Sequence, residues 1–242
     1  GVQTCALPIY TILIDGGGAT NANKFDVGSN TLIPYILDKK IYRLDYIIIS
    51  HFDSDHVGGL LSVMEKLKVN NVVISKQEND SYNYKRFKEI INKKHIKVVI
   101  VGKGDKIRID DDLYFNILWP RRNKLISENT LNNNSIVCKL YYKNFSMLFT
   151  GDIEEIAENE ILQEYSNSSI LKSTVLKVAH HWSKTSSTQK FIEAVSPKIA
   201  LIGVGKNNKF GHPNENVLER LKNQKAIIYR TDQMGEITIT IN

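Results

Sequence analysis

The segment SHFDSDHVGG, residues 50–59, places two histidines and two aspartates within six positions. Carboxylates crowded in this way repel one another unless a cation or a proton neutralises them. The segment follows the apolar run DYIIIS, which predicts a buried strand, and its two glycines allow a close turn into a helix. It therefore predicts a metal site on a tight loop at a strand end, with these candidate ligands: His51, Asp53, Asp55 and His56.

Two further predicted strand ends carry residues that could complete such a site. SMLFTGD places Asp152 after a strand and a glycine, and VLKVAHH places His180 and His181 at the end of another strand. A single aspartate at a strand end is more often a turn or helix cap than a ligand. Together with residues 50–59, however, three strand ends that present His and Asp fit a hydrolase with two metal ions.

The elements that must position these residues alternate between strands and helices. Two mixed halves of this kind predict a layered α/β sandwich, whose sites gather where strands end. The segment NTLNNNS is loop-like in composition. The predicted strands are 10–18, 44–50, 70–75, 96–102, 106–120, 173–181 and 198–205, with a hairpin over 135–152 around Lys143-Asn144 and two strands over 226–241. The predicted helices are 29–40, 60–67, 84–93, 153–165, 187–195 and 214–223.

Length and composition set broad limits. The 242 residues suffice for one large domain or two small ones. A hydrophobic content of 42% with 24% charged residues is ordinary for a soluble globular protein. No apolar run reaches the roughly 20 residues of a membrane helix. The net charge of +6 gives a mild preference for acidic partners such as nucleic acid, although a merely basic surface explains it equally well.

The opening GVQTCALPI differs from the rest of the chain. It back-translates, with one codon choice, to a sequence that resembles a common sequencing-adapter oligonucleotide, so we interpret residues 1–9 as a non-native scar. Native sequence then begins inside a strand at Tyr10, and we expect the true N-terminus to be missing. The remaining cysteine, Cys138, is expected to be a small buried residue, and no disulfide framework exists.

SHFDSDHVGG, FTGD and AHHWSKTSS together resemble the metallo-β-lactamase superfamily. More closely, the chain resembles the soluble hydrolase domain of the DNA-internalisation competence (ComEC-like) family, through ILIDGGG, NNNSIV, LFTGDIEEIAENEIL, FGHPNENVLERL and YRTDQMGEITI. The resemblance covers nearly all of residues 10–242 and implies a single domain. The implied fold is a four-layer αββα sandwich with metals at one edge of its sheets. A further N-terminal strand that ends in a DVGQGD-like turn is usual in the family and absent here.

The resemblance also implies a ligand set for two divalent metal ions. His51 and Asp53 hold the first metal, and Asp55 and His56 hold the second. Asp152 bridges the two. One histidine of the pair His180-His181 completes the coordination of the second metal, while the other contacts the substrate phosphate or donates a proton.

The first metal site departs from the usual superfamily pattern. Many members have a third histidine there, where this chain reads NNNS, so Asn134, a neighbour or a water must serve. Oxygen ligands suit Mn²⁺ or Mg²⁺ better than an all-histidine set does. Zinc is therefore expected at the second site, and the first is expected to be weak, labile or filled by manganese.

Other residues are expected to surround the metals. Asp15, at the end of the first predicted strand, is expected to support the ligands or form a turn rather than bind metal directly. Trp182 stands where the family has glycine, and either narrows the site, offers a stacking face or covers the core. The remaining candidates are Asp55, His181 and His212 as catalytic groups, and Ser183 and Lys184 as residues near ligands or substrate.

The resemblance implies hydrolysis of a phosphodiester, with DNA as the substrate during uptake. Two alternatives stay open: a stand-alone hydrolase of a small phosphodiester or other ester, and a metal-stabilised binding module that does not catalyse. A competence protein would carry a membrane channel upstream in the same chain and be membrane-associated. Without such segments the protein would be cytoplasmic.

Overall fold

The structure is a computed structural model that describes residues 10–18, 25–180, 185–206 and 214–241. The chain divides into two compact units, Gly1–Val101 and Gly102–Asn242. Each unit contains its own β-sheet and its own hydrophobic cluster. The scar predicted for residues 1–9 lies outside the described residues.

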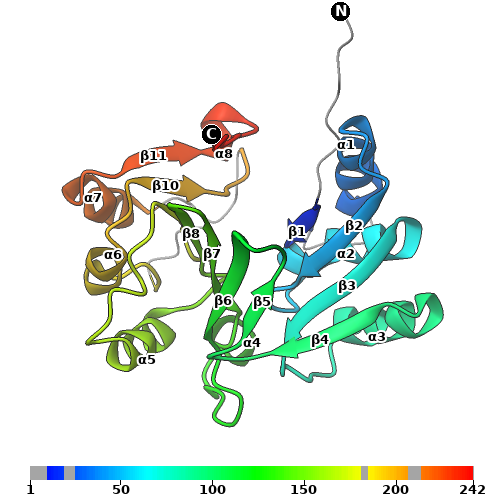
Figure 1. Ribbon diagram of the computed structural model, residues 1–242, viewed down its shortest axis with the longest axis horizontal. Coiled ribbons are helices and arrows are strands. Elements are labelled where there is room, and N and C mark those ends of the chain that lie inside the picture. The colour runs from blue at the N-terminus through cyan, green and yellow to red at the C-terminus, as the bar shows by residue number, and fades with distance from the viewer. Residues whose placement is uncertain (1–9, 19–24, 181–184, 207–213, 242) are drawn as a thin grey trace, which may run out of the picture. The chain divides into compact units, whose positions relative to one another are not determined.

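The first unit is a parallel sheet packed against helices (Figure 1). The helix α2 directs Leu60, Val63 and Met64 into a core that includes Ile47 and Val72 from the sheet. Parallel strands buried in this way read as continuous β-branched and aliphatic runs. The sheet order is β1 (Ile12–Ile14), β2 (Arg43–Ile48), β3 (Lys68–Ser75) and β4 (Lys97–Val101). The helices are η1 (Gly28–Leu32), α1 (Ile33–Asp38), α2 (Ser54–Lys66) and α3 (Tyr82–Lys94).

The second unit has a seven-stranded sheet in the order β11-β10-β9-β8-β7-β6-β5. The pairs from β8 to β11 are parallel, and those from β5 to β8 are antiparallel. The strands are β5 (Lys106–Arg108), β6 (Leu113–Trp119), β7 (Val137–Tyr142), β8 (Phe145–Phe149), β9 (Val175–Lys177), β10 (Ile199–Ile202) and β11 (Ile227–Arg230). The helices are α4 (Thr130–Asn133), α5 (Glu155–Glu164), α6 (Gln189–Val195), α7 (Glu215–Asn223) and α8 (Thr231–Met234).

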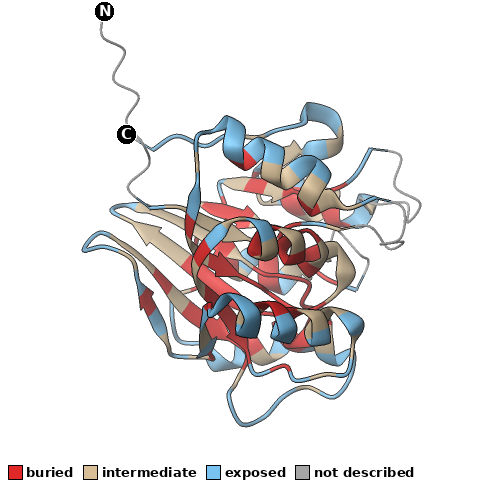
Figure 2. Ribbon diagram, turned by 90° about the vertical axis from the view of Figure 1, so that its right-hand side faces the viewer, coloured by how far each residue is buried: buried red, intermediate tan, exposed pale blue. Residues whose placement is uncertain are grey.

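Buried side chains of α5, α6 and α7 pack on the parallel part of this second sheet. Ile161, Phe191 and Val217 are among them, and each is at most 1% exposed. Figure 2 shows that buried residues concentrate in the strands and on the inward faces of the helices. None of the described helices has the length and apolar character needed to span a membrane.

Three segments differ from the sequence prediction. Residues 106–120 form a hairpin rather than one strand, because Asp110–Asp112 occupy a turn closed by hydrogen bonds to the Leu113 carbonyl. NTLNNNS contains the short helix α4 instead of only loop. Of the two strands expected over 226–241 only β11 forms, and α8 follows it directly.

Candidate metal centre

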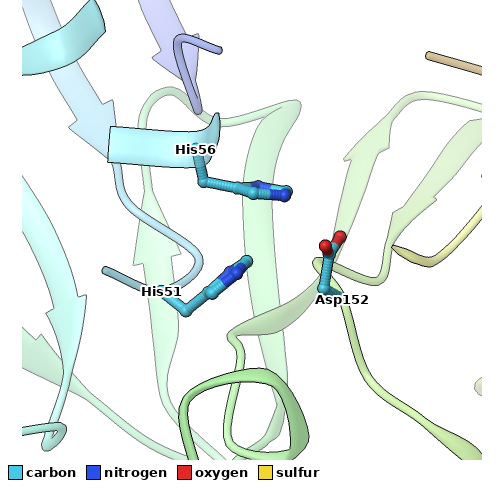
Figure 3. Close-up of side chains that lie close together, drawn as sticks. All are labelled: His51, His56 and Asp152. Atoms are coloured by element: carbon cyan, nitrogen blue, oxygen red, sulfur yellow. The ribbon is translucent and has the colours of Figure 1, made fainter. Parts of the chain in front are cut away.

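The loop between β2 and α2 presents two buried histidines. His51 precedes the helix, and His56 lies in its first turn, so the second half of HFDSDH is helical rather than loop. The Asp53 carbonyl starts the helix by accepting the N–H groups of His56 and Val57, both at 3.0 Å. The residues His51 and His56 are 1% and 3% exposed, and their ring centroids lie 4.1 Å apart. Figure 3 shows both rings with the elements that carry them.

Phe52 packs this loop against the helix α3. Its ring packs on Tyr84 and Phe87 of α3, with centroid separations of 4.9 and 5.2 Å. Asn83 Nδ2 donates to the Phe52 carbonyl at 3.2 Å and to Ser54 Oγ at 3.0 Å. The apolar residue inside the polar motif therefore fixes the backbone that carries the two histidines.

Asp15 and Ser50 form hydrogen bonds behind the two imidazoles. Asp15 Oδ1 accepts the Ser50 N–H at 2.8 Å, and Oδ2 accepts the Ser50 hydroxyl at 2.7 Å. The same Oδ2 lies 2.8 Å from His56 Nδ1, and Ser50 Oγ lies 2.9 Å from His51 Nδ1. Both histidines thus have their Nδ1 atoms engaged by one small hydrogen-bonded group. Such partners fix ring orientation around metals.

The environment of Asp15 stabilises its ionised form. Burial acts to raise its pKa, but the attraction of His56, the hydrogen bonds it accepts and the attraction of His51 outweigh burial, so the pKa lies below its usual value. Asp15 has a φ of 54°, a conformation that is uncommon for non-glycine residues and often marks functional sites.

Glycines allow the chain after Asp15 to approach the start of α2. A Cβ on Gly18 would lie 1.8 Å from the Ser54 carbonyl oxygen, and one on Gly59 would lie 2.3 Å from that of Gly16. The close approach lets Gly16 N–H donate to the His56 carbonyl at 2.8 Å. The glycine turn therefore ties β1 to the helix that carries His56.

The donor atoms of the first unit fit a metal ion. His51 Nε2 is buried and has no hydrogen-bond partner within the described part of the chain. A carboxylate oxygen, Asp53 Oδ2, lies 3.5 Å from this nitrogen. Ligand atoms about 2.1 Å from one tetrahedral zinc ion are separated by about 3.4 Å. His51 and Asp53 therefore have the spacing of two ligands of one metal. Asp55 lies in the first turn of α2, between Ser54 and His56.

In the second unit, Asp152 follows the end of β8 after Thr150 and Gly151. Figure 3 shows its carboxylate. Asp152 is 3% exposed, and its N–H donates to Ser135 Oγ at 3.2 Å. Its Oδ1 accepts the backbone N–H of His180 at 3.2 Å. The structure therefore brings two of the predicted ligands, Asp152 and His180, side by side at the ends of β8 and β9.

His180 has polar neighbours on both ring nitrogens. Its Nδ1 lies 3.5 Å from Glu154 Oε1 and from Ser186 Oγ, and its Nε2 lies 3.5 Å from Asn132 Nδ2. Glu154 itself receives hydrogen bonds from Asn133 Nδ2 and Thr185 Oγ1 at 3.3 and 3.1 Å. The φ of His180 is 47°, so this residue also has an unusual backbone conformation.

Two asparagines of the NNNS segment have different surroundings. The Asn134 amide bonds its own loop, since Nδ2 donates to the Ile126 and Thr130 carbonyls and Oδ1 accepts the Ile126 N–H. Asn132 is 6% exposed, lies beside His180, and its Oδ1 has no hydrogen-bond partner among the described residues. Asn132, two residues before Asn134 and beside His180, is therefore better placed than Asn134 to contact a ligand.

Several predicted site residues lie outside the described part of the chain: His181, Trp182, Ser183, Lys184 and His212. Two residues that sequence reasoning missed are Ser50 and Glu154. The signal for Ser50 was its place directly before the first histidine. Glu154 had no comparable signal, because its contacts reach across segments far apart in the sequence.

The family model for the metallo-beta-lactamase superfamily matches residues 10–206. The chain belongs to this superfamily. Among curated relatives, ComE operon protein 3 of Bacillus subtilis is 33% identical over 235 residues, which are 93% of this chain and 29% of that protein. Competence protein ComA of Neisseria gonorrhoeae is 29% identical over 218 residues, which are 88% of this chain and 28% of that protein. The chain thus spans less than a third of the length of these relatives.

The solved structure of the metallo-beta-lactamase fold protein YhfI from Bacillus subtilis aligns with a TM-score of 0.52 at 16% identity. The alignment covers 91% of this chain and 83% of YhfI. At this identity the likeness speaks for the fold alone. The predicted α/β metallo-β-lactamase fold and the resemblance to competence proteins are both confirmed.

Proposed function

We propose that the chain is a metal-dependent phosphodiesterase that hydrolyses DNA, and that its superfamily site holds two divalent metal ions. The proposed ligands of the first metal are His51 and Asp53, with Asp55 and His56 on the second and Asp152 as the bridge. One histidine of the pair His180-His181 is proposed to complete the coordination of the second metal. The other, together with His212, is proposed to contact the substrate or donate a proton.

The observation that carries this proposal is the buried pair His51 and His56. Each Nδ1 is engaged by the Asp15–Ser50 group, and His51 Nε2 lies 3.5 Å from a carboxylate oxygen of Asp53. A buried imidazole nitrogen without a hydrogen-bond partner is costly in a folded protein unless a ligand satisfies it. A metal ion is the ligand that an imidazole beside several carboxylates would bind.

Bound metals would lower the pKa of a coordinated water and neutralise charge on the phosphodiester. In the net reaction, the water oxygen bonds to phosphorus, the bond from phosphorus to the leaving oxygen breaks, and a proton reaches that oxygen. His212, or the histidine of the pair His180-His181 that does not bind metal, is proposed to supply this proton. Asp152 is well suited to hold a fixed position, since it is buried, its backbone N–H donates to Ser135 Oγ, and its Oδ1 accepts the His180 N–H.

The mixed donor set supports different metals at the two positions. Asp53 would supply an oxygen ligand to the first metal. The segment NNNS replaces the further histidine that many superfamily members have there, and that histidine would favour zinc. We propose zinc at the second position and a labile metal, such as manganese, at the first. Two tightly held zinc ions per chain in elemental analysis would contradict this assignment.

The choice of DNA as substrate is supported by the relatives, one of which is named as a competence protein, and by the net charge of +6. Because the chain spans under a third of these relatives, we propose that it belongs to a longer, membrane-associated protein with a channel. Sequencing the gene upstream of the Tyr10 codon tests this part, since several apolar segments of about 20 residues are expected there. Their absence would leave a stand-alone, cytoplasmic hydrolase.

The decisive experiment measures hydrolysis of single-stranded DNA and of a chromogenic phosphodiester in added Mn²⁺ or Zn²⁺. We expect turnover that a chelator abolishes, and a loss of roughly 100-fold or more in Asp152→Asn. Asp105→Asn is the matched control, because Asp105 lies in the same unit but bonds Gly102 and Arg122. Cleavage of the small diester alone would overturn DNA as substrate. No turnover on either would overturn the enzyme in favour of a binding module.

A further inference from the structure

Ser50 stands between the aspartate and one of the two buried histidines. It is 3% exposed, and its side-chain oxygen lies 2.7 Å from Asp15 Oδ2 and 2.9 Å from His51 Nδ1. The distance from the same oxygen to His56 Nδ1 is longer, at 3.4 Å. Ser50 therefore contacts His51 more closely than His56, while His56 contacts Asp15 directly at 2.8 Å.

The distances leave one consistent arrangement of protons. Asp15 Oδ1 accepts a backbone N–H, and its Oδ2 faces Ser50 Oγ and His56 Nδ1, so Asp15 acts as the acceptor throughout. Serine has a single hydroxyl proton, and a contact of 2.7 Å to a carboxylate oxygen requires that proton. Ser50 Oγ can then only accept from His51, which places a proton on His51 Nδ1.

We propose that Ser50 is a positioning residue that holds His51 in the Nδ1–H tautomer, so that the lone pair of His51 Nε2 is directed to a metal ion. The link to a metal rests on the proposed function, whereas the tautomer does not. Asp15 then serves both histidines: it orients His56 directly and His51 through the serine hydroxyl. Loss of the Ser50 hydroxyl affects His51 selectively, while loss of the Asp15 carboxylate affects both rings.

The first test needs no variant. Long-range ¹H–¹⁵N spectra of the metal-free chain at about pH 8, above the usual histidine pKa of about 6.5, report which ring nitrogen carries the proton. We expect His51 to be a single Nδ1–H tautomer. A proton on Nε2, or a mixture of tautomers, would overturn the proposal.

In Ser50→Ala, His51 Nδ1 loses its acceptor, and a proton on Nε2 would face Asp53 Oδ2, which lies 3.5 Å away. We therefore expect the His51 tautomer to shift toward Nε2–H and the zinc affinity, measured by competition with a chelator, to fall roughly 10- to 100-fold. Ser50→Thr keeps the hydroxyl and should restore both properties. Ser62→Ala is the matched control, since it removes another serine bond to an aspartate, Asp26, also at 2.7 Å.

The outcomes separate the two claims. Unchanged zinc affinity in Ser50→Ala, or an equal loss in Ser62→Ala, would overturn the positioning role. A wild-type chain that has the expected tautomer but binds no zinc would overturn the proposed metal centre instead. If Ser50→Ala does not fold, the wild-type spectrum still decides the tautomer, and a mixed or Nε2–H tautomer there would still overturn the proposal.

Discussion

The two site histidines of the first unit are held more tightly than His180 of the second. His51 and His56 are at most 3% exposed, and their Nδ1 atoms lie 2.8–2.9 Å from Ser50 or Asp15. His180 has a side chain that is 24% exposed, and its ring nitrogens lie 3.5 Å from their polar neighbours. The two histidines of the first unit are thus pre-oriented by short hydrogen bonds, while the contacts of His180 are longer and weaker.

This difference follows from how each half is built. In the first unit, both histidines come from a single strand–loop–helix segment that Phe52 pins to α3. In the second, the residues come from α4 and from the ends of β8 and β9, which are separate in sequence. If the proposed metal ions bind, they should order the second half more than the first, because ligands that are not pre-oriented gain the most order from the ion.

The largest expected effect compares the two supporting carboxylates. Asp15→Asn places an amide where three donors meet, so at least one buried donor loses its acceptor, and the free energy of unfolding should fall by about 3 kcal/mol. Glu154→Gln should cost less than about 1 kcal/mol, since its longer contacts can rearrange. Urea denaturation measures both, and equal losses would remove the proposed contrast between the units.

Zinc should raise the stability of the chain by about 2.7 kcal/mol at a free concentration 100 times its dissociation constant. If ligands from both units share the metals, Asp53→Asn and Asp152→Asn should both reduce this gain. Thermal unfolding with and without zinc measures the effect. A gain that survives intact in Asp152→Asn would show that the first unit binds zinc alone.

The carboxylates Glu158 and Asp15, one in each unit, should respond to pH in opposite directions. Burial of Glu158 on α5 raises its pKa to about 6, despite the N–H groups of Ser187 and Thr188 that it accepts. A carboxyl with a raised folded-state pKa contributes stability that is present below its unfolded pKa, near 4.3, and is lost as pH rises through 6. Asp15, with its lowered pKa, contributes stability that is lost as pH falls.

Between pH 4.5 and 7, the stability of the wild type relative to Glu158→Gln should therefore fall by about 2 kcal/mol. Unfolding in urea across this range measures the difference. Parallel profiles for the two proteins would contradict the raised pKa of Glu158.

The smallest expected effects concern partly exposed ion pairs at the surface, which should not distinguish the units. Arg86 bonds Glu65 and Glu89 in the first unit, and Arg121 bonds Glu160 and Glu164 in the second. Each replacement by alanine should cost less than about 1 kcal/mol, because solvent screens such pairs. A loss above about 2 kcal/mol in either variant would reveal a structural role that exposure alone does not predict.

The sequence determined the features that depend on neighbouring residues. The crowding in HFDSDH, the preceding buried strand and the following helix were all local patterns, as was the hairpin at Lys143-Asn144. The superfamily and its α/β fold followed from these motifs and were confirmed. The predictions failed where local composition was ambiguous, as in 106–120, where the strand pattern hid a turn of three aspartates.

Only the tertiary structure decided which side chains support the ligands. Ser50 and Asp15 are 35 residues apart in sequence, and Asn132 and His180 are 48 residues apart. No periodicity or spacing links residues at such separations, because sheet pairing and helix packing bring them together. For the same reason, the sequence left Asn134, a neighbour or a water open, whereas the folded loop bonds the Asn134 amide to its own backbone and places Asn132 beside His180.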